Sequence, residues 1–167
     1  MSMFLIQFIG AVGYTLLSLS YFKKEKRQIL FMQIISYLFF ALHYYFLSGI
    51  TGTICNLLGL FSLLSIYLFE KYKLKNKLFI SVLFILLIFI INMMTFQNIY
   101  SIFPMIASII VIVSFFSNDE TFIRKIGIVS AICWLIYAIV YKSYISLIFE
   151  FFTFINVITA FVKNRKK

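Results

Sequence analysis

The sequence predicts an all-α integral membrane protein, and three observations support this fold class. First, 63% of the 167 residues are hydrophobic and only 12% are charged, whereas a soluble domain has about 45–50% apolar and about 25% charged residues. Second, the chain contains seven long apolar runs, most of them close to the roughly 20 residues that a helix needs to cross a bilayer. Third, the basic residues gather in every second connection between these runs.

The seven apolar runs follow one another with short connections, which leaves no room for a soluble domain. They cover residues 4–22, 29–47, 50–69, 78–94, 102–116, 126–141 and 145–162. The fifth and sixth runs are short, so we expect their polar flanks to extend the helices. No Lys or Arg precedes the first run and no small-residue cleavage site follows it. The first run is therefore predicted to be a retained span and not a signal peptide.

The basic residues predict the orientation of the chain. The connections after the first, third and fifth runs and the C-terminal tail hold 14 of the 15 Lys and Arg residues, and Lys142 alone lies on the opposite side. The positive-inside rule then places the N-terminus outside and the C-terminus in the cytoplasm. An odd number of spans likewise requires the two termini to lie on opposite sides of the membrane. The net charge of +10 is therefore explained by topology, and we predict no binding of nucleic acid.

An internal repeat is predicted from the spacing of small and polar residues. When the sequence is aligned with itself at a shift of 94 residues, the first three runs align with the last three without a gap. The third and seventh runs then have small or polar residues at the same positions. These are Gly49, Gly52, Asn56, Gly59, Ser62 and Ser65, with Ser143, Ser146, Glu150, Thr153, Asn156 and Thr159. Steps of three and four place each set on one helix face. We predict two parallel three-helix bundles, residues 1–77 and 98–167, joined by a lipid-facing linker helix within 78–97.

Simpler interpretations apply to several of these residues. Small residues also let membrane helices pack closely, and we favour that role for the glycines. Pro104 is most simply a helix kink, with a hinge as the alternative. Cys55 and Cys133 lie within spans and are predicted to be packing residues without a disulfide. The chain has no metal-binding or phosphate-binding motif and no catalytic triad, so we predict no enzyme activity, no metal and no cofactor.

The layout and several motifs resemble a known family. The stretch from His43 to Gly59, with Asn56 three residues before its end, is similar to the His…Gly…Asn-x-x-Gly signature of the YgjV-type bacterial inner membrane proteins. The Phe-Pro-Met-Ile-Ala-Ser run at 103–108 is similar as well. That family is itself similar in architecture to the SWEET, semiSWEET and PQ-loop superfamily, with the same three-one-three layout. The resemblance implies a multi-pass protein of the bacterial inner membrane.

The resemblance to SWEET-like carriers also implies a central pocket. In those carriers an Asn on the third span and its partner on the seventh face the pocket, and residues on the second and sixth spans close it. By resemblance, Asn56 and Trp134 occupy two such positions, with Phe40 opposite Trp134. Glu150 stands where the second Asn would be, so the resemblance does not imply a neutral sugar pocket.

Glu150 is the one acidic residue inside a span, and His43 is the one histidine in the chain. A lone carboxylate in a membrane usually faces a cavity or a partner, so we predict a proton carrier or a ligand for a cationic substrate, with a structural hydrogen bond as the alternative. His43 and Glu150 would meet if the halves pack symmetrically, and a proton relay is then possible. The alternative is an interfacial His bonded to a backbone carbonyl.

We therefore predict passage of a small polar solute between the two bundles. The predicted pathway residues are Asn56, Glu150, Trp134, His43, Phe40 and Tyr137, with Asn156 and Thr153 deeper towards the cytoplasm. Tyr44, Tyr45 and Tyr137 have an alternative place in the aromatic belt at the membrane surface. A receptor or partner-binding protein, or a lipid-handling protein, is the alternative function. The expected partners are membrane lipids and an unidentified small molecule, and an oligomer is possible but not required.

Overall fold

The computed structural model of the chain describes residues 1–20, 26–72, 77–114, 120–152 and 155, and these form helices joined by short turns. The helices are α1 (Met3–Ser20), α2 (Lys26–Phe46), α3 (Ile50–Tyr72), α4 (Lys77–Met94), the single 3-10 turn η1 (Ile99–Ser101), α5 (Ile102–Ser114) and α6 (Glu120–Val140). Residues 144–152 are helical as well, and we call residues 143–152 the final segment. No strand occurs among these described residues.

The helices coincide closely with the predicted apolar runs, because long apolar stretches without Gly or Pro clusters favour helix in a membrane. Two of them, Met3–Ser20 and Ile50–Phe69, are long and apolar enough by length and composition to cross a membrane. Four further apolar stretches are shorter, at Leu30–Phe46, Phe79–Met94, Ile99–Val113 and Ile128–Val140. The seventh predicted run is helical to residue 152 and otherwise lies outside the described residues, apart from residue 155.

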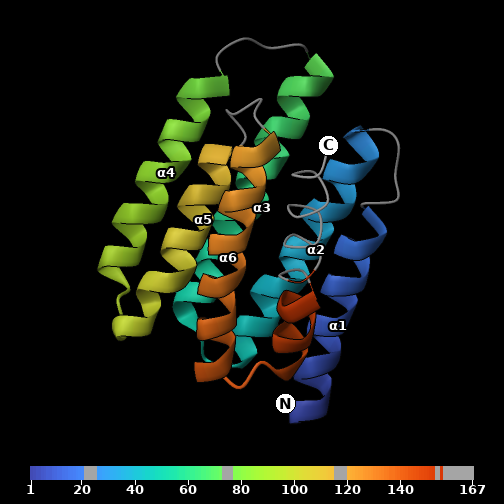
Figure 1. Ribbon diagram of the computed structural model, residues 1–167, viewed down its shortest axis with the longest axis vertical. Coiled ribbons are helices and arrows are strands. Elements are labelled where there is room, and N and C mark those ends of the chain that lie inside the picture. Colours follow the sequence, from blue (N-terminus) through green and yellow to red (C-terminus); the bar gives the residue numbers. More distant parts are fainter. Residues whose placement is uncertain (21–25, 73–76, 115–119, 153–154, 156–167) are drawn as a thin grey trace.

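The helices run alternately up and down in one bundle (Figure 1). α2 packs against both α1 and α3, α4 packs against α3 and α5, and α5 packs against α3 and α6. The N-terminus, the α2–α3 turn, the α4–η1 connection and the turn before the final segment all lie at one end, which we call the turn end (Figure 1). The final segment starts at the turn end and lies beside α1, to which it is joined by side-chain hydrogen bonds.

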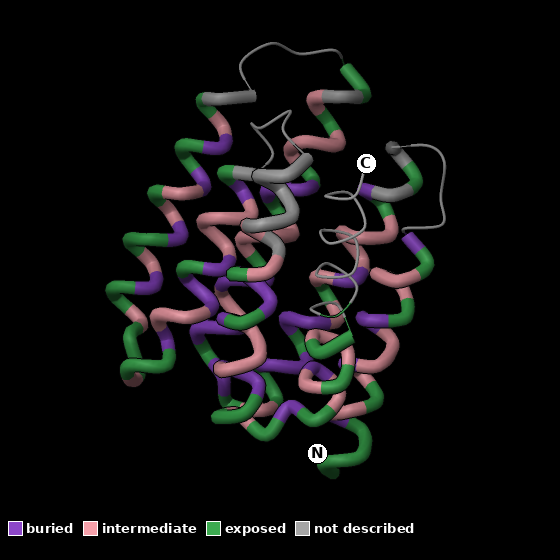
Figure 2. The backbone as a smooth tube through the Cα atoms, viewed as in Figure 1, coloured by how far each residue is buried: buried purple, intermediate pink, exposed green. Residues whose placement is uncertain are grey.

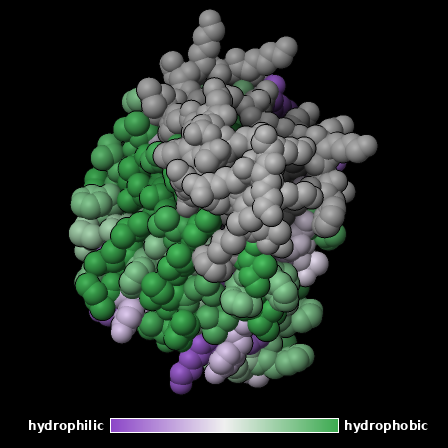
Figure 3. Space-filling model, viewed as in Figure 1, coloured by the Kyte–Doolittle hydropathy of each residue, from purple (hydrophilic) through white to green (hydrophobic). Residues whose placement is uncertain are grey.

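Apolar side chains occur both inside and outside the bundle. Phe84 and Ile88 of α4 pack with Met105 and Ile112 of α5 in a buried core, while many Phe, Leu and Ile side chains are exposed. Figure 2 shows the buried positions on the inward faces of the helices, and Figure 3 shows hydrophobic residues over most of the visible described surface. Lipid tails are as apolar as these side chains, so burial in a bilayer gains little. Close packing and polar contacts must therefore hold the helices together.

The two polar residues of α4, Ser81 and Asn92, lie on its buried side. Ser81 and Asn92 are buried at 5% and 1% exposure, and both belong to the helix face that packs inward. The Asn92 side chain donates to the Ile88 carbonyl at 2.7 Å and accepts from the Cys55 thiol at 3.5 Å. α4 therefore has one lipid-facing side and one buried side, because an amide in the bilayer needs hydrogen-bond partners.

Pro104 lies in the first turn of α5, directly after η1. Proline is tolerated at the start of a helix, where backbone N–H groups lack an intrahelical acceptor. The change from a 3-10 turn to an α-helix thus takes place beside the proline, and the expected kink lies at a helix start and not in mid-span. A hinge at Pro104 stays a prediction.

Two turns of the chain have the same backbone hydrogen bonds at positions 94 apart. In the first, Ser48 N–H donates to the Tyr45 carbonyl at 3.0 Å and Gly49 N–H to the Tyr44 carbonyl at 2.8 Å. In the second, Lys142 N–H donates to the Ile139 carbonyl at 3.2 Å and Ser143 N–H to the Ala138 carbonyl at 2.9 Å. Ser48 and Lys142 also share the left-handed conformation, with φ of 60° and 53°. The two helix ends are therefore built alike.

Candidate functional site

A chain of polar side chains crosses the interface between α1, α2 and the final segment. It consists of His43, Ser143, Ser146, Tyr14, Tyr44 and Glu150, and we call it the polar chain. Ser143, Ser146 and Glu150 share one face of the final segment because they are three and four residues apart. α1 and α2 supply the remaining members from the opposite side of the interface. The polar chain thus collects six groups that can form hydrogen bonds in a mostly apolar protein.

His43 forms the end of the polar chain nearest the turn end and is fully buried. Its Nδ1 lies 2.8 Å from the Ile6 carbonyl oxygen, and its Nε2 lies 2.6 Å from the Ser143 hydroxyl. A carbonyl can only accept, so Nδ1 carries the proton and Nε2 of the neutral ring accepts from Ser143. The bond to a backbone carbonyl, which was the alternative for His43, is therefore present, and the proton relay stays a prediction.

Gly10 makes this contact possible. A methyl group at Gly10 would lie 2.9 Å from His43 Nδ1 and 2.6 Å from the Ile145 side chain. α1 can therefore approach α2 and the final segment only because residue 10 has no side chain. This explains the small residue in the first span as a packing feature that serves the polar chain.

The other half of the polar chain leads to Glu150. The hydroxyls of Ser143 and Ser146 share a hydrogen bond of 2.5 Å, and the phenol groups of Tyr14 and Tyr44 lie beside Ser146. The Tyr14 hydroxyl donates to Glu150 Oε1 at 3.1 Å. Three hydroxyl groups therefore lie between His43 and Glu150. The relay between these two residues stays a prediction.

Aromatic rings pack around the part of the polar chain that contains Tyr14 and Tyr44. Tyr14 packs on Phe40 with ring centroids 4.5 Å apart and stacks on Phe149 at 4.8 Å. Tyr44 lies 5.3 Å from the His43 ring and 5.7 Å from Trp134. The rings keep lipid and water away from the hydroxyls, which strengthens the hydrogen bonds inside.

Gln7 closes the polar chain at the turn end. Its side-chain nitrogen donates to the Lys142 carbonyl at 3.0 Å, and its side-chain oxygen accepts from Ile145 N–H at 3.1 Å. One amide therefore binds both sides of the turn that precedes the final segment. We call this pair of bonds the Gln7 clamp. Gln97 plays a similar part for α3, since its side-chain oxygen accepts from Ile50 N–H at 3.1 Å.

Tyr137 has a comparable structural role on the opposite half of the molecule. Its hydroxyl oxygen accepts from Gly52 N–H at 2.8 Å and so caps the first turn of α3. Tyr137 and Tyr44 are fully and almost fully buried, with ring centroids 5.3 Å apart. The expectation that these two tyrosines lie in a surface belt is therefore wrong, while Tyr45, at 64% exposure, fits that place. The spacing of residues in the sequence does not show that Tyr44 is buried while the adjacent Tyr45 is exposed.

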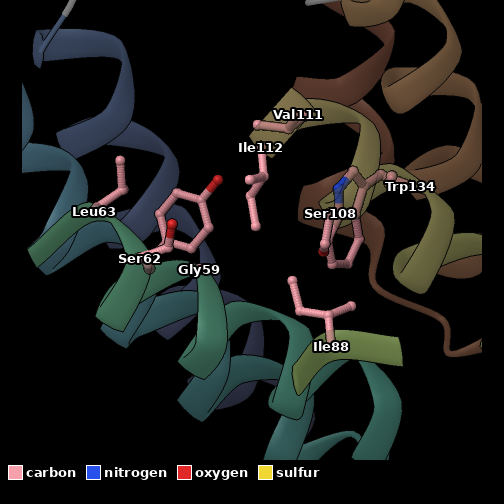
Figure 4. Close-up of a pocket in the computed structure, with 10 residues that line it drawn as sticks. Gly59, Ser62, Leu63, Ile88, Ser108, Val111, Ile112 and Trp134 are labelled. Atoms are coloured by element: carbon pink, nitrogen blue, oxygen red, sulfur yellow. The ribbon is translucent and has the colours of Figure 1, made fainter. Parts of the chain in front are cut away.

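A small pocket lies between α3, α4, α5 and α6 (Figure 4). Its volume is about 30 Å³, which is room for about two water molecules. Gly59 and Ser62 of α3 face Ser108 of α5 and the Trp134 ring across the pocket (Figure 4). Tyr37, Leu63, Ile88, Ala107, Val111 and Ile112 complete the lining. Trp134 therefore lines a small pocket and also contacts Tyr44 of the polar chain, while its place on a substrate pathway stays a prediction.

The structure places the other predicted site residues as follows. Asn56 is buried at 3% exposure, and its side chain donates to the Gly52 carbonyl of its own helix at 2.7 Å. Phe40 is buried against Tyr14 and Gly13, on the α1 side of α2. Thr153 and Asn156 lie outside the described residues. The role of these residues in a pathway stays a prediction.

Sequence reasoning did not single out Tyr14, Tyr44, Ser143 or Ser146 as functional residues. Three of the four were recognisable, because Ser143 and Ser146 lie on the small and polar face of the seventh run and Tyr14 lies on that of the first. Nothing in the sequence showed that these two faces meet. Their contact depends on the packing of α1 against the final segment.

Comparison with known proteins agrees with this picture. A family model described as bacterial inner membrane protein, Imp-YgjV, matches residues 4–167. The chain belongs to this YgjV family. No curated protein and no solved structure was found to match the chain, so the likeness to SWEET and PQ-loop proteins has no support from these comparisons. Membership of the YgjV family places the protein in the bacterial inner membrane, and the helical bundle is that of a multi-pass membrane protein.

Proposed function

We propose that this YgjV-family protein moves a small polar solute across the bacterial inner membrane. The observation that supports the proposal most is the polar chain, because it gathers a half-buried carboxyl group, a buried imidazole and four hydroxyls between helices of a membrane protein. Polar groups at this depth destabilise a membrane protein unless they are paired, and they usually mark a substrate or ion route.

An internal repeat supports a mechanism of alternating access. The two turns with matching hydrogen bonds lie 94 positions apart. The contacts beyond the turns match as well, because His43 binds Ser143 while Tyr137, 94 residues after His43, lies against Gly49, 94 residues before Ser143. Two similar halves that face one another can rock about the interface between them. We therefore propose two three-helix units, with α4 as the linker.

The proposed topology has seven spans with the turn end outside. The helices alternate in direction (Figure 1). Among the residues that the structure describes, those at the helix ends opposite the turn end include the basic Lys26, Arg27, Lys71, Lys77, Arg124 and Lys125, whereas Lys142 lies at the turn end. This arrangement agrees with the positive-inside rule. The proposed seventh span begins with the final segment, and the rest of its apolar run lies outside the described residues.

The pocket and the Gln7 clamp indicate that this conformation is closed. A volume of about 30 Å³ holds about two waters and is far below the roughly 300–1,000 Å³ of a typical ligand site. Passage of a solute therefore requires the two halves to separate, and the pocket between α3 and α5 marks where they would open. Trp134 would contact the solute there.

The proposal is tested with the purified protein and a panel of radiolabelled sugars, amines, amino acids and nucleosides. A thermal-shift screen finds the compounds that bind, since a ligand at a hundred times its Kd adds about 2.7 kcal/mol to stability. Each compound that binds is then assayed for uptake into proteoliposomes. We expect saturable uptake that Trp134→Leu and Glu150→Gln reduce at least about tenfold. Tyr45→Phe, at an exposed position, is the matched control.

Two results would contradict transport. One is the absence of uptake of any binding compound by protein that remains folded in the vesicles. The other is uptake that both pocket and polar-chain variants leave unchanged. A partner that co-purifies in detergent without solute uptake would favour a receptor, and accelerated movement of fluorescent lipid between leaflets would favour lipid handling.

A further inference from the structure

We propose that the polar chain conducts protons between Glu150 and His43, so that solute movement is coupled to a proton. This inference rests on the proposed function for its biological meaning, but the proton route itself is a property of the side chains. It assigns to Tyr14, Ser146 and Ser143 the role of relay groups between two ionisable ends. Tyr44 is assigned a positioning role beside Ser146.

The geometry gives two hydrogen-bonded stretches that meet at Tyr14 and Ser146. Glu150 bonds to Tyr14 at one end, while Ser146 bonds to Ser143 and Ser143 bonds to Nε2 of His43 at the other. The Tyr14 phenol lies beside Ser146, and a hydrogen bond between these two hydroxyls completes the proposed relay. Glu150 and Ser143 are seven residues apart on one helix face, which corresponds to about 10 Å along the helix axis. A proton could therefore cover about a third of the hydrocarbon thickness without entering water.

The donors and acceptors allow net transfer of one proton. When Glu150 is protonated, its O–H donates to Tyr14, and each hydroxyl donates to the next group until Ser143 donates to Nε2 of His43. A concerted shift then leaves Glu150 as a carboxylate and His43 as an imidazolium, with every hydroxyl still carrying one hydrogen. The Nδ1–H bond to the Ile6 carbonyl is kept throughout. The positive ring therefore retains an acceptor after the transfer.

The surroundings of the relay contain few other ionisable groups. The described titratable side chains against Glu150 are the phenols of Tyr14 and Tyr44. Beside Ser143, Lys142 is exposed and touches the Gln7 clamp through its backbone carbonyl. Glu150 is half-buried, whereas His43 is fully buried. Proton exchange at the His43 end therefore requires the Gln7 clamp to open, because this clamp lies over the turn that carries Ser143.

A purely structural polar chain would show the same hydrogen bonds, so the test must measure proton movement. We would place the full-length protein in nanodiscs of phosphatidylethanolamine and phosphatidylglycerol and release protons from a caged acid. Time-resolved infrared spectroscopy follows the carboxylic acid carbonyl band, which Glu150→Gln identifies by its loss. No solute is needed, so the result is independent of whether transport is found.

The relay variants remove one hydroxyl each and change little else. Protonation of the half-buried Glu150 raises this band, and transfer of the proton to His43 lowers it again. We expect Tyr14→Phe and Ser143→Ala to slow this decay by at least about tenfold, because proton transfer through a positioned group is far faster than through a gap. The initial rise of the band should stay the same. Tyr45→Phe, next to Tyr44 but exposed, should leave the rate unchanged.

Two outcomes would overturn the relay. In the first, Glu150 gains no proton over the range in which the protein stays folded. In the second, the band of protonated Glu150 decays as fast in Tyr14→Phe and Ser143→Ala as in wild type, which means that Glu150 loses its proton by another path. Thermal unfolding of each variant shows that it is folded. Solute uptake without proton movement in the proteoliposome assay would refute the relay and leave the proposed transport standing, whereas protonation without uptake would do the reverse.

Discussion

The contact between Gly52 and Tyr137 gives the sharpest prediction about what holds the two halves together. A methyl group at Gly52 would lie 2.5 Å from Tyr137 Cε1 and 3.1 Å from Tyr44 Cγ. Both rings are buried, so neither can move into open space. We expect Gly52→Ala to push Tyr137 away from α3 and to break the 2.8 Å bond from Gly52 N–H to the Tyr137 hydroxyl.

The expected change in the free energy of unfolding follows from two destabilising contributions and one stabilising contribution. Overpacking a close contact costs about 1–3 kcal/mol, and loss of the backbone hydrogen bond costs about 0.5–1.5 kcal/mol. Alanine gains about 1 kcal/mol over glycine in a helix. The free energy of unfolding should therefore fall by about 0.5–3.5 kcal/mol. A second substitution, Tyr137→Leu, should remove the clash, so the double variant loses less stability than the sum of the two single variants.

Unfolding by a denaturing detergent in mixed micelles provides the measurement. Trp134 is the only tryptophan in the chain and its ring centroid lies 6.1 Å from that of Tyr137, so its fluorescence reports on this contact directly. Leu57→Ala, at an exposed position of α3, is the control and should change stability much less. Gly52→Ala as stable as wild type, or single effects that simply add in the double variant, would refute the reasoning.

Three further predictions follow from other contacts. Gln7→Leu should lower the free energy of unfolding by about 1–2 kcal/mol, because it removes both bonds of the Gln7 clamp with little change of volume. Denaturation of the variant beside the wild type measures this difference, and equal stability of the two would contradict the prediction. Buried Cys55 and Cys133 should resist a maleimide reagent in the native protein and react after unfolding, and rapid native labelling of Cys55 would show that its environment is misassigned. In a cysteine-free background, Ser48→Cys should be labelled from outside in right-side-out spheroplasts and Tyr72→Cys only after permeabilisation, whereas the opposite pattern would reverse the orientation.

The predicted helices and the structure agree because both depend on local properties. A run of apolar residues in a membrane has to satisfy its backbone groups within itself, so its hydropathy nearly fixes where a helix begins and ends. The turn around Ser48 is equally local, and its counterpart at Lys142 repeats it.

The composition and order of the residues thus determined a helical membrane protein. The resemblance to the YgjV-type family implied the bacterial inner membrane, and the family match confirms this location. The tertiary structure alone decided which polar faces meet: Tyr14 of α1 reaches Glu150, and His43 of α2 reaches Ser143, because both helices lie against the final segment. Tyr44 and Tyr45 are neighbours in sequence, yet one is 3% and the other 64% exposed. Hydropathy measures how well a residue tolerates lipid, whereas hydrogen bonds depend on distances of a few tenths of an ångström between groups more than a hundred residues apart.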